Sequence, residues 1–330
     1  MALSARLRAN DGPRGGPQDR SWIRLTPGQL EARARVLAKL DDGTYALESA
    51  PCFCGEPASD LEIAGRDRYG LPVRTVLCPS CGLMRSDPRM DADSTARFYQ
   101  DDYRDLYTGP GNGDALFASQ VSRGRGLVKL LEKLLPTIDT VYEIGCGAGG
   151  LLLPFAEQGK RVAGVDLGDE YLEFGRAQGL SLVHGSADDL LAQAGEPADL
   201  VLLLHVLEHY LDLSEGIEQT LRLVRPGGLL LIEVPGIASI ATGYRGDLLS
   251  YLQNAHNFHF TAATLEFVLR RCGLDVLASS ESALALCQRP QVANDTANPP
   301  KPNAAAEVLR TLADLERAFC ERAARERARQ

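Results

Sequence analysis

Three groups of residues in this 330-residue sequence have the types and spacing for chemistry: a glycine-rich turn, two cysteine pairs and five histidines. In the stretch 141–150, VYEIGCGAGG, the residues Gly145, Gly147 and Gly150 match the pattern G-x-G-x-x-G. Such glycines let a strand turn tightly into a helix beside a bound nucleotide. Asp166 ends the next apolar run, where an acidic side chain accepts hydrogen bonds from ribose hydroxyls. The sequence therefore predicts a nucleoside-containing ligand at this turn.

The turn and Asp166 alone suit both NAD and S-adenosylmethionine, because both contain an adenosine ribose. Glu143 separates them, because a carboxylate two residues before Gly145 repels a diphosphate and attracts an amino group. S-adenosylmethionine carries an amino group and a sulfonium there. Polar residues also gather in HVLEH, after a central apolar run, and ligands of open α/β sheets bind at the carboxyl ends of the strands.

Short apolar runs alternate with amphipathic segments from about 124 to 290, which is typical of a parallel α/β sheet. We expect seven strands, at TVYEIG, RVAGVD, LSLVHG, DLVLLLH, GLLLIEVP, LDVLASS and ALALCQ. A Pro-Gly-Gly turn is expected directly before the fifth strand. Thr26 and Pro27 predict the N-cap and first residue of an N-terminal helix.

The motifs E-x-G-x-G-x-G, a distal aspartate, LEH and L-x-P-G-G before an apolar strand together resemble the class I S-adenosylmethionine-dependent methyltransferases. The resemblance covers about residues 125–290. It implies an α/β fold with a Rossmann-like seven-stranded sheet, preceded by a small zinc-ribbon-like domain and followed by a C-terminal helix. Ser186 stands where the family often has an acidic residue beside the adenine, so Asp188 or a backbone amide takes that role. The expected cofactor-binding residues are Glu143, Gly145, Cys146, Gly147, Asp166, Leu167, Ser186, Ala187, Asp188 and His205.

The pairs C-F-C-G and C-P-S-C-G lie 23 residues apart and have the spacing of a metal knuckle. Four thiolates in two turns are what tetrahedral Zn²⁺ needs, and four protein ligands leave no open coordination position. The sequence therefore predicts a structural zinc ion; the alternatives are four reduced thiols or a redox pair. The expected ligands are Cys52, Cys54, Cys78 and Cys81.

The cysteine pairs, then C-G-L-x(4)-P and F-Y-x-x-x-Y ahead of the methyltransferase core, are similar to bacterial methyltransferases of sugars, glycans and natural products. This resemblance implies transfer of a methyl group to a sugar or sugar-like hydroxyl. The C-methylating members carry a further C-terminal domain that this sequence does not show, which favours O-methylation over C-methylation of a deoxysugar.

Transfer to an alcohol needs a base, and histidine is the usual one near neutral pH. We expect His256 as the base, with His259 and His209 as alternatives, because the resembled sugar methyltransferases have a histidine-containing stretch at this place. His205, Glu208 and His209 could also bind a divalent cation, as a Glu-x-x-Glu-His site does in related quinone O-methyltransferases.

Tyrosines recur every four residues before the core, and a helix would put them on one face. They could form a lid over the acceptor or a packing stripe. The expected acceptor contacts are Tyr99, Tyr103, Tyr107, Tyr244 and Arg245.

The net charge of −9 and the absence of a basic-aromatic surface argue against an RNA methyltransferase, and a non-catalytic scaffold conflicts with the intact glycine turn. We expect a small-molecule or glycan acceptor, no membrane contact and a cytoplasmic location. The apolar stripe of the last helix either packs on the body or forms a homodimer. The expected division is a disordered tail (1–20), an N-terminal helix, zinc segment and lid (21–110), the core (111–290), a linker (291–303) and the C-terminal helix (304–330).

Overall fold

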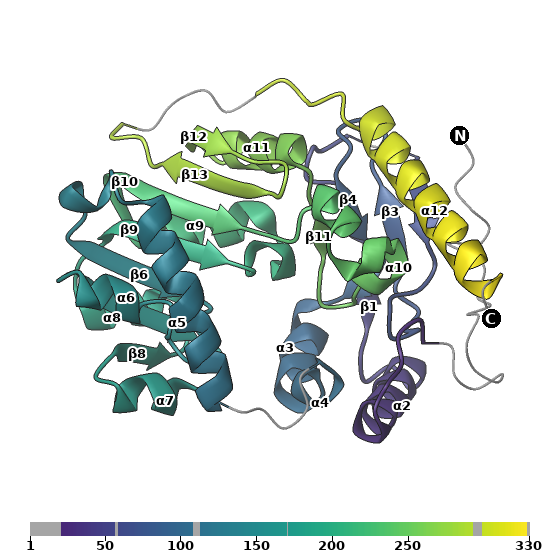
Figure 1. The fold of residues 1–330 in the computed structure, drawn as a ribbon, viewed down its shortest axis with the longest axis horizontal. Coiled ribbons are helices and arrows are strands. Elements are labelled where there is room, and N and C mark those ends of the chain that lie inside the picture. Colours follow the sequence, from purple (N-terminus) through teal and green to yellow (C-terminus); the bar gives the residue numbers. More distant parts are fainter. Residues whose placement is uncertain (1–20, 57–58, 108–112, 170, 293–298, 329–330) are drawn as a thin grey trace.

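The computed structural model describes residues 21–56, 59–107, 113–169, 171–292 and 299–328. Its main element is a seven-stranded sheet in the order β12-β13-β10-β9-β6-β7-β8 (Figure 1). The predicted α/β fold is confirmed, and all seven strands are present. Their bounds are β6 (Thr140–Ile144), β7 (Arg161–Asp166), β8 (Ser181–His184), β9 (Ala198–Leu204), β10 (Val224–Glu233), β12 (Asp275–Ser279) and β13 (Leu284–Gln288). Only β13 is antiparallel to its neighbours β10 and β12, so β6 to β10 all end at one edge.

The central strand β9 explains the two helical layers. Val201 and Leu203 pack into one apolar cluster with α8, α9 and α11, whereas Leu200 and Leu202 pack into the other with α5, α6 and α7. A strand buried on both faces presents alternate side chains to opposite layers. The helices are α5 (Gly113–Leu130), α6 (Leu153–Glu157), α7 (Leu172–Ala177), α8 (Ala187–Ala194), α9 (Leu213–Arg222) and α11 (Ala262–Arg271).

The expected Pro-Gly-Gly turn lies inside the start of β10 rather than before it. The register between β10 and β9 shifts between Val224 and Leu229. Pro226 has no N–H to donate to a neighbouring strand, so this part of the strand is irregular.

A second sheet, in the order β11-β4-β3-β2, lies beside the first and combines distant parts of the chain. Its strands are β2 (Leu61–Ala64), β3 (Thr75–Leu77), β4 (Met84–Ser86) and β11 (Phe258–His259). The strand β11 follows β10 in the chain, yet it pairs antiparallel with β4, with Phe258 opposite Arg85. The insert after β10 is thereby joined to the N-terminal segment. The insert contains η3 (Ile237–Ala241), η4 (Tyr244–Gly246) and α10 (Leu248–Tyr251).

The N-terminal helices pack beside this second sheet (Figure 1). Thr26 and Gln29 form a capping box at the start of α2, at the predicted residue. The buried carboxylate of Asp102 joins these helices, because it accepts hydrogen bonds from Lys39 and Tyr45. The elements here are α2 (Pro27–Asp41), β1 (Leu47–Glu48), β5 (Arg89–Met90), α3 (Ala92–Asp101) and α4 (Tyr103–Tyr107), and η1 (Leu135–Thr137) and η2 (Leu207–His209) complete the described elements.

The C-terminal helix α12 (Ala305–Arg327) lies along the second sheet (Figure 1). Val308, Leu312 and Leu315 are buried against residues of the second sheet and the insert, and Phe319 contacts Trp22. The stripe therefore packs on the body of its own chain, as one of the two alternatives expected. The predicted tail 1–20, residues 108–112 at the boundary between the predicted lid segment and core, and part of the predicted linker (293–298) lie outside the described residues. Among the described helices, none combines the length and apolarity needed to cross a bilayer.

Candidate active site and cysteine cluster

The glycine loop after β6 has a backbone that only glycine adopts without strain. Gly145 and Gly147 have φ values of 72° and 54°. A Cβ atom on Gly145 would also lie 2.5 Å from Val206. The helix α5 holds the loop in place, because the Gln120 side chain donates to the Cys146 carbonyl over 2.9 Å. These contacts shape a turn at the carboxyl edge of the sheet.

Asp166 joins the loops that follow β6 and β7. Its two carboxylate oxygens accept the backbone N–H groups of Gly147 over 2.8 Å and of Gly168 over 2.7 Å. Leu167, the next residue, is 76% exposed. An acidic group and an exposed apolar side chain at this edge can take a ribose and an adenine ring, respectively.

Glu143 is the strongest sign of a ligand at this edge. Its side chain is buried, and its Oε2 atom has no hydrogen-bond partner among the described residues. Burial, and then the charge of Asp166, raise the pKa of this carboxyl well above its usual value. A buried acceptor without a partner is costly, so an ammonium group placed against Glu143 would be strongly favoured. The site therefore fits the amino group of S-adenosylmethionine.

The other expected cofactor residues make local contacts. Ser186 caps α8 through Asp189, and Ala187 is the first residue of that helix. Asp188 forms an ion pair with Arg222 over 3.1 Å, and Cys146 is buried in the core. Contact of these four residues with the cofactor stays a prediction.

His205 follows β9 with a left-handed backbone, at φ 59°. Its ring lies between two carboxylates, 3.5 Å from Glu208 and 3.4 Å from Glu233. Burial would lower the pKa of His205, but the two carboxylates outweigh it and raise the pKa to about 9. Glu233 in turn pairs with Arg123 over 2.8 Å, and the contact with His205 lowers the pKa of Glu233 to about 2.

Sequence reasoning missed Glu233 and Arg123. Glu233 ends the fifth predicted strand, and that position was a usable signal because β6 and β10 end at the same edge. Arg123 has no such signal, because it belongs to a helix whose position depends on packing.

A second group of residues surrounds the Glu208 carboxylate, which is 1% exposed and whose two oxygens have no hydrogen-bond partner among the described residues. His209 Nε2 lies 3.9 Å and His256 Nε2 lies 3.8 Å from Glu208 Oε1. His209 Nδ1 lies 2.9 Å from the Ala255 carbonyl. A carbonyl only accepts, so Nδ1 carries the proton and Nε2 is the free basic nitrogen.

The three expected bases differ in environment. His259 is 1% exposed, and burial lowers its pKa to about 3. Burial also lowers the pKa of His256 well below its usual value, and lowers that of His209. The His209 side chain retains 20% exposure, against 5% for that of His256. His209 therefore combines access with a free nitrogen.

Glu208, His209 and His256 could also hold a metal ion, since one ligand atom of each lies within 4.8 Å of the others. The structure groups His256 with the expected Glu208 and His209. His205 contacts Glu208 but lies outside this set.

The three tyrosines do not lie on one helix, because Tyr99 belongs to α3 and Tyr103 and Tyr107 belong to α4, yet their rings form a row. The ring centroids of Tyr99 and Tyr103 are 4.7 Å apart, and those of Tyr103 and Tyr107 are 4.6 Å apart. The Tyr99 hydroxyl lies 2.7 Å from His209 Nδ1, and Tyr107 donates to Asn254. We call Tyr99, Tyr103 and Tyr107 the tyrosine row.

Tyr244 and Arg245 both have left-handed backbones, with φ values of 47° and 56°. The Tyr244 ring packs on Tyr251 at 5.2 Å, and the Arg245 carbonyl accepts from Arg322. Their contact with an acceptor stays a prediction.

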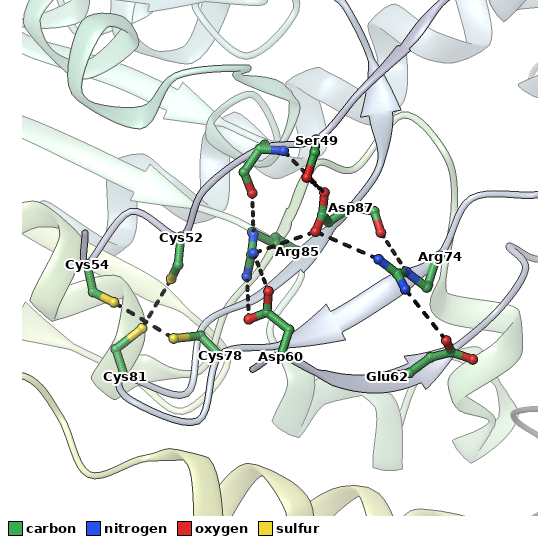
Figure 2. A network of polar contacts seen from close by, with 11 residues as sticks. Ser49, Cys52, Cys54, Asp60, Glu62, Arg74, Cys78, Cys81, Arg85 and Asp87 are labelled. Carbon is green, nitrogen blue, oxygen red and sulfur yellow. Dashed lines mark hydrogen bonds and ion pairs between the residues drawn. The ribbon is translucent and has the colours of Figure 1, made fainter. Parts of the chain in front are cut away.

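The four predicted zinc ligands converge in one buried cluster (Figure 2). Cys52 and Cys81 sulfurs are 3.5 Å apart, and those of Cys54 and Cys78 are 3.8 Å apart. A tetrahedral Zn²⁺ with Zn–S bonds of about 2.3 Å separates its sulfurs by roughly 3.8 Å, so the donors fit zinc.

The cysteine cluster connects the second sheet to the core. Arg85 of β4 donates to the Ala50 carbonyl, beside the first cysteine pair, and pairs with Asp60 (Figure 2). On the other side, Phe53 packs edge-on against Phe267 of α11 at 6.0 Å. The cysteine cluster thus lies between the second sheet and α11.

Comparison with known proteins agrees with this architecture. Residues 117–279, just under half of the chain, match the family model described as "Methyltransferase domain". The ubiquinone biosynthesis O-methyltransferase of Caulobacter vibrioides is 32% identical over 99 residues, which cover 28% of this chain and 39% of the relative. That of Rhizobium rhizogenes is 29% identical over 156 residues, covering 42% and 60%.

The chain spans about two fifths of the length of the first of these relatives. Among solved structures, an O-methyltransferase family protein from Burkholderia thailandensis aligns with a TM-score of 0.42 and 19% identity, covering 61% of this chain and 63% of that one. A SAM-dependent methyltransferase from Methanosarcina mazei aligns with a TM-score of 0.36 and 17% identity, covering 47% and 93%.

Proposed function

We propose that the protein transfers a methyl group from S-adenosylmethionine to a hydroxyl oxygen of a sugar or sugar-like acceptor. The observation that carries the proposal is the buried, unpartnered Oε2 atom of Glu143 beside the loop held by Asp166. The O-methyltransferase names of the relatives support the reaction class but specify no sugar. The sugar class rests on the sequence resemblance, and the tyrosine row lies beside His209 on the proposed acceptor side.

The site residues form two groups, one for the cofactor and one for the acceptor. Glu143 and Asp166 bind and orient the cofactor, which supplies an electrophilic methyl group when bound. The tyrosine row and Glu208 border the acceptor side, next to His209. Orientation of two reactants in line is a large part of such catalysis.

His209 is our choice for the base. Its Nε2 would take the hydroxyl proton of the acceptor, whose oxygen would receive the methyl group that bound S-adenosylmethionine supplies, with S-adenosylhomocysteine as the product. The Ala255 carbonyl holds the Nδ1 proton and so fixes the tautomer. Glu208 lies close enough to stabilise the imidazolium that results.

A divalent cation on Glu208, His209 and His256 is a second candidate for activating the hydroxyl, favoured by the closeness of the three donors. A bound cation would lower the pKa of a coordinated alcohol. If so, a chelator that leaves the zinc cluster loaded would abolish turnover, whereas the His209 mechanism predicts unchanged turnover.

We also propose that the four cysteines hold a structural zinc ion. A cytoplasmic location and a homodimer stay predictions from the sequence.

The first test is calorimetric titration of zinc-loaded protein with S-adenosylhomocysteine, with NAD as the comparison. We expect S-adenosylhomocysteine alone to bind, and Asp166→Ala to abolish binding. Transfer of labelled methyl groups from S-adenosylmethionine to a panel of sugars and nucleotide sugars then tests the acceptor class. A folded protein that binds neither ligand would contradict the proposal.

A further inference from the structure

Arg68 lies in the turn after β2, beside the tyrosine row. Its backbone N–H donates to the Leu252 carbonyl over 2.9 Å, which ties the turn after β2 to the insert after β10. The neighbouring Asp67 carboxylate accepts the backbone N–H groups of Tyr69 and Leu71 in the turn and that of Asn254 in the insert. Arg68 is therefore held in place by backbone contacts.

The Arg68 guanidinium has an unused donor. It lies 4.9 Å from the ring centroid of Tyr69 and 5.4 Å from that of Tyr107, and it donates one hydrogen bond, to the Tyr69 hydroxyl. Its Nε atom is buried and has no hydrogen-bond partner among the residues that the structure describes. Arg68 forms no ion pair with a carboxylate in the described parts of the chain. A permanent positive charge thus keeps a buried N–H unpaired, which an anionic ligand would satisfy.

The guanidinium continues the tyrosine row. Arg68 lies against Tyr107, which stacks on Tyr103 and then Tyr99, whose hydroxyl contacts His209. The row therefore has the proposed base at one end and an arginine at the other. Consider an acceptor whose ring lies along the tyrosine row with one hydroxyl at His209. Another substituent of that ring would then extend toward Arg68.

The charge of Arg68 acts on titratable residues of three separate segments. Burial is the main influence on the pKa values of Tyr103, Tyr244 and His256, and the positive charge of Arg68 lowers all three. These residues come from α4, the insert and the segment before β11. Arg68 is therefore close enough to influence one residue of each of these segments.

We propose that Arg68 is the anion-recognition residue of the acceptor site, and that the acceptor is a sugar carrying a phosphate ester. This inference rests on the proposed function, since it describes the same acceptor. The planar guanidinium can donate to two oxygens of a phosphate at once. The tyrosine row beside it would border the sugar ring that carries the phosphate.

The test uses the full chain, zinc-loaded and saturated with S-adenosylhomocysteine. The probes are UDP-glucose, glucose 1-phosphate, glucuronate and methyl glucoside, titrated by calorimetry. The variants are Arg68→Gln and Arg68→Lys. The matched control is Arg74→Gln, an arginine just before β3 that pairs with Glu62 and Asp87.

We expect at least one phosphate-bearing probe to bind and the neutral glucoside not to bind. Arg68→Gln should weaken that binding about tenfold or more, Arg68→Lys should restore part of it, and Arg74→Gln should leave it unchanged. Binding of S-adenosylhomocysteine should be the same in all variants.

Three results would overturn the inference: equal binding to Arg68→Gln, tighter binding of glucuronate than of either phosphate, or no phosphate binding in protein that binds S-adenosylhomocysteine. Failure to bind S-adenosylhomocysteine at all would contradict the proposed function instead. The two failures are therefore distinguishable. A melting temperature for each variant shows that loss of binding does not reflect unfolding.

Discussion

The Tyr99 hydroxyl lies 2.7 Å from Nδ1 of His209, although the two residues are 110 positions apart in the chain. Tyr99 belongs to α3, His209 to the turn after β9, and the Ala255 carbonyl that shares Nδ1 belongs to the insert after β10. The His209 imidazole is therefore oriented by contacts with α3 and with the insert, as well as by its own turn. Its other nitrogen faces Glu208 and is free to take a proton.

This arrangement predicts that His209→Gln loses activity without losing the cofactor. Removal of a general base costs about 10²- to 10⁴-fold in kcat. Tyr99→Phe should cost less, about tenfold, because the Ala255 carbonyl still holds the ring. Methyl transfer and S-adenosylhomocysteine binding should be measured on the same preparations.

His256→Gln is the comparison variant for this prediction. A loss of kcat that is larger for His256→Gln than for His209→Gln would assign the base to His256 instead.

Glu143 predicts that cofactor binding strengthens as pH rises. Burial holds the pKa of this carboxyl well above its usual value, so Glu143 of the free protein stays protonated to a higher pH than an exposed glutamate does. The ammonium of the ligand favours the carboxylate, so binding releases a proton. Affinity for S-adenosylhomocysteine should therefore rise as pH is raised over the range in which the protein stays folded, by up to about tenfold per unit.

Calorimetry in buffers of different ionisation enthalpy measures the released proton directly. Glu143→Gln should bind more weakly and lose the pH dependence. An affinity of the unchanged protein that is flat over this range would show that Glu143 is already ionised.

The cysteine cluster predicts a large loss of stability when zinc is removed. Cys78→Ser should lower the zinc content and lower the melting temperature by about 10 °C or more, because structural zinc contributes directly to folding. Cys320→Ser is the matched control, since Cys320 is exposed on α12 and remote in sequence from the cluster. Metal analysis and thermal melts check both variants.

A melting temperature of Cys78→Ser equal to that of Cys320→Ser would mean that the four thiols need no metal.

Two glycines of α5 predict opposite effects of the same substitution. A Cβ atom on Gly124 would lie 2.5 Å from the Leu151 carbonyl oxygen, whereas nothing lies within 4 Å of one on Gly126. Gly124→Ala should destabilise the protein by about 1–3 kcal/mol through overpacking. Gly126→Ala should stabilise it by about 0.5–1 kcal/mol, because alanine favours the helix.

Thermal or denaturant unfolding measures the difference between the two variants. Because α5 also holds the glycine loop, Gly124→Ala should weaken S-adenosylhomocysteine binding as well. Equal stability of both variants would show that α5 can move away from the loop at no cost.

The residues of the cofactor side could be predicted because their positions depend on short stretches of chain. Glu143, Gly145 and Gly147 lie in one strand and its turn, and Asp166 ends the adjacent strand. Parallel neighbours end at the same edge, so alternation of apolar runs is enough to bring these groups together. The cysteine pairs are predictable for a similar reason, since each pair occupies a single turn.

The acceptor side depends on contacts that the pattern of residues does not encode. His209 and His256 meet only because β11 pairs with β4, which folds the insert back against the N-terminal segment. Arg68 and Arg123 belong to a turn and a helix whose positions follow from packing rather than from a motif.

By itself the sequence determined the seven-stranded α/β sheet, the meeting of Glu143, the glycine turn and Asp166 at one edge of it, and the cysteine cluster, because strand periodicity and short motifs act locally. Only the tertiary structure decided that Tyr99 reaches His209, that His256 joins Glu208, and that Arg68 ends the tyrosine row. Each of those contacts joins segments more than 30 residues apart, and their meeting is set by the packing of two sheets and not by any one stretch of chain.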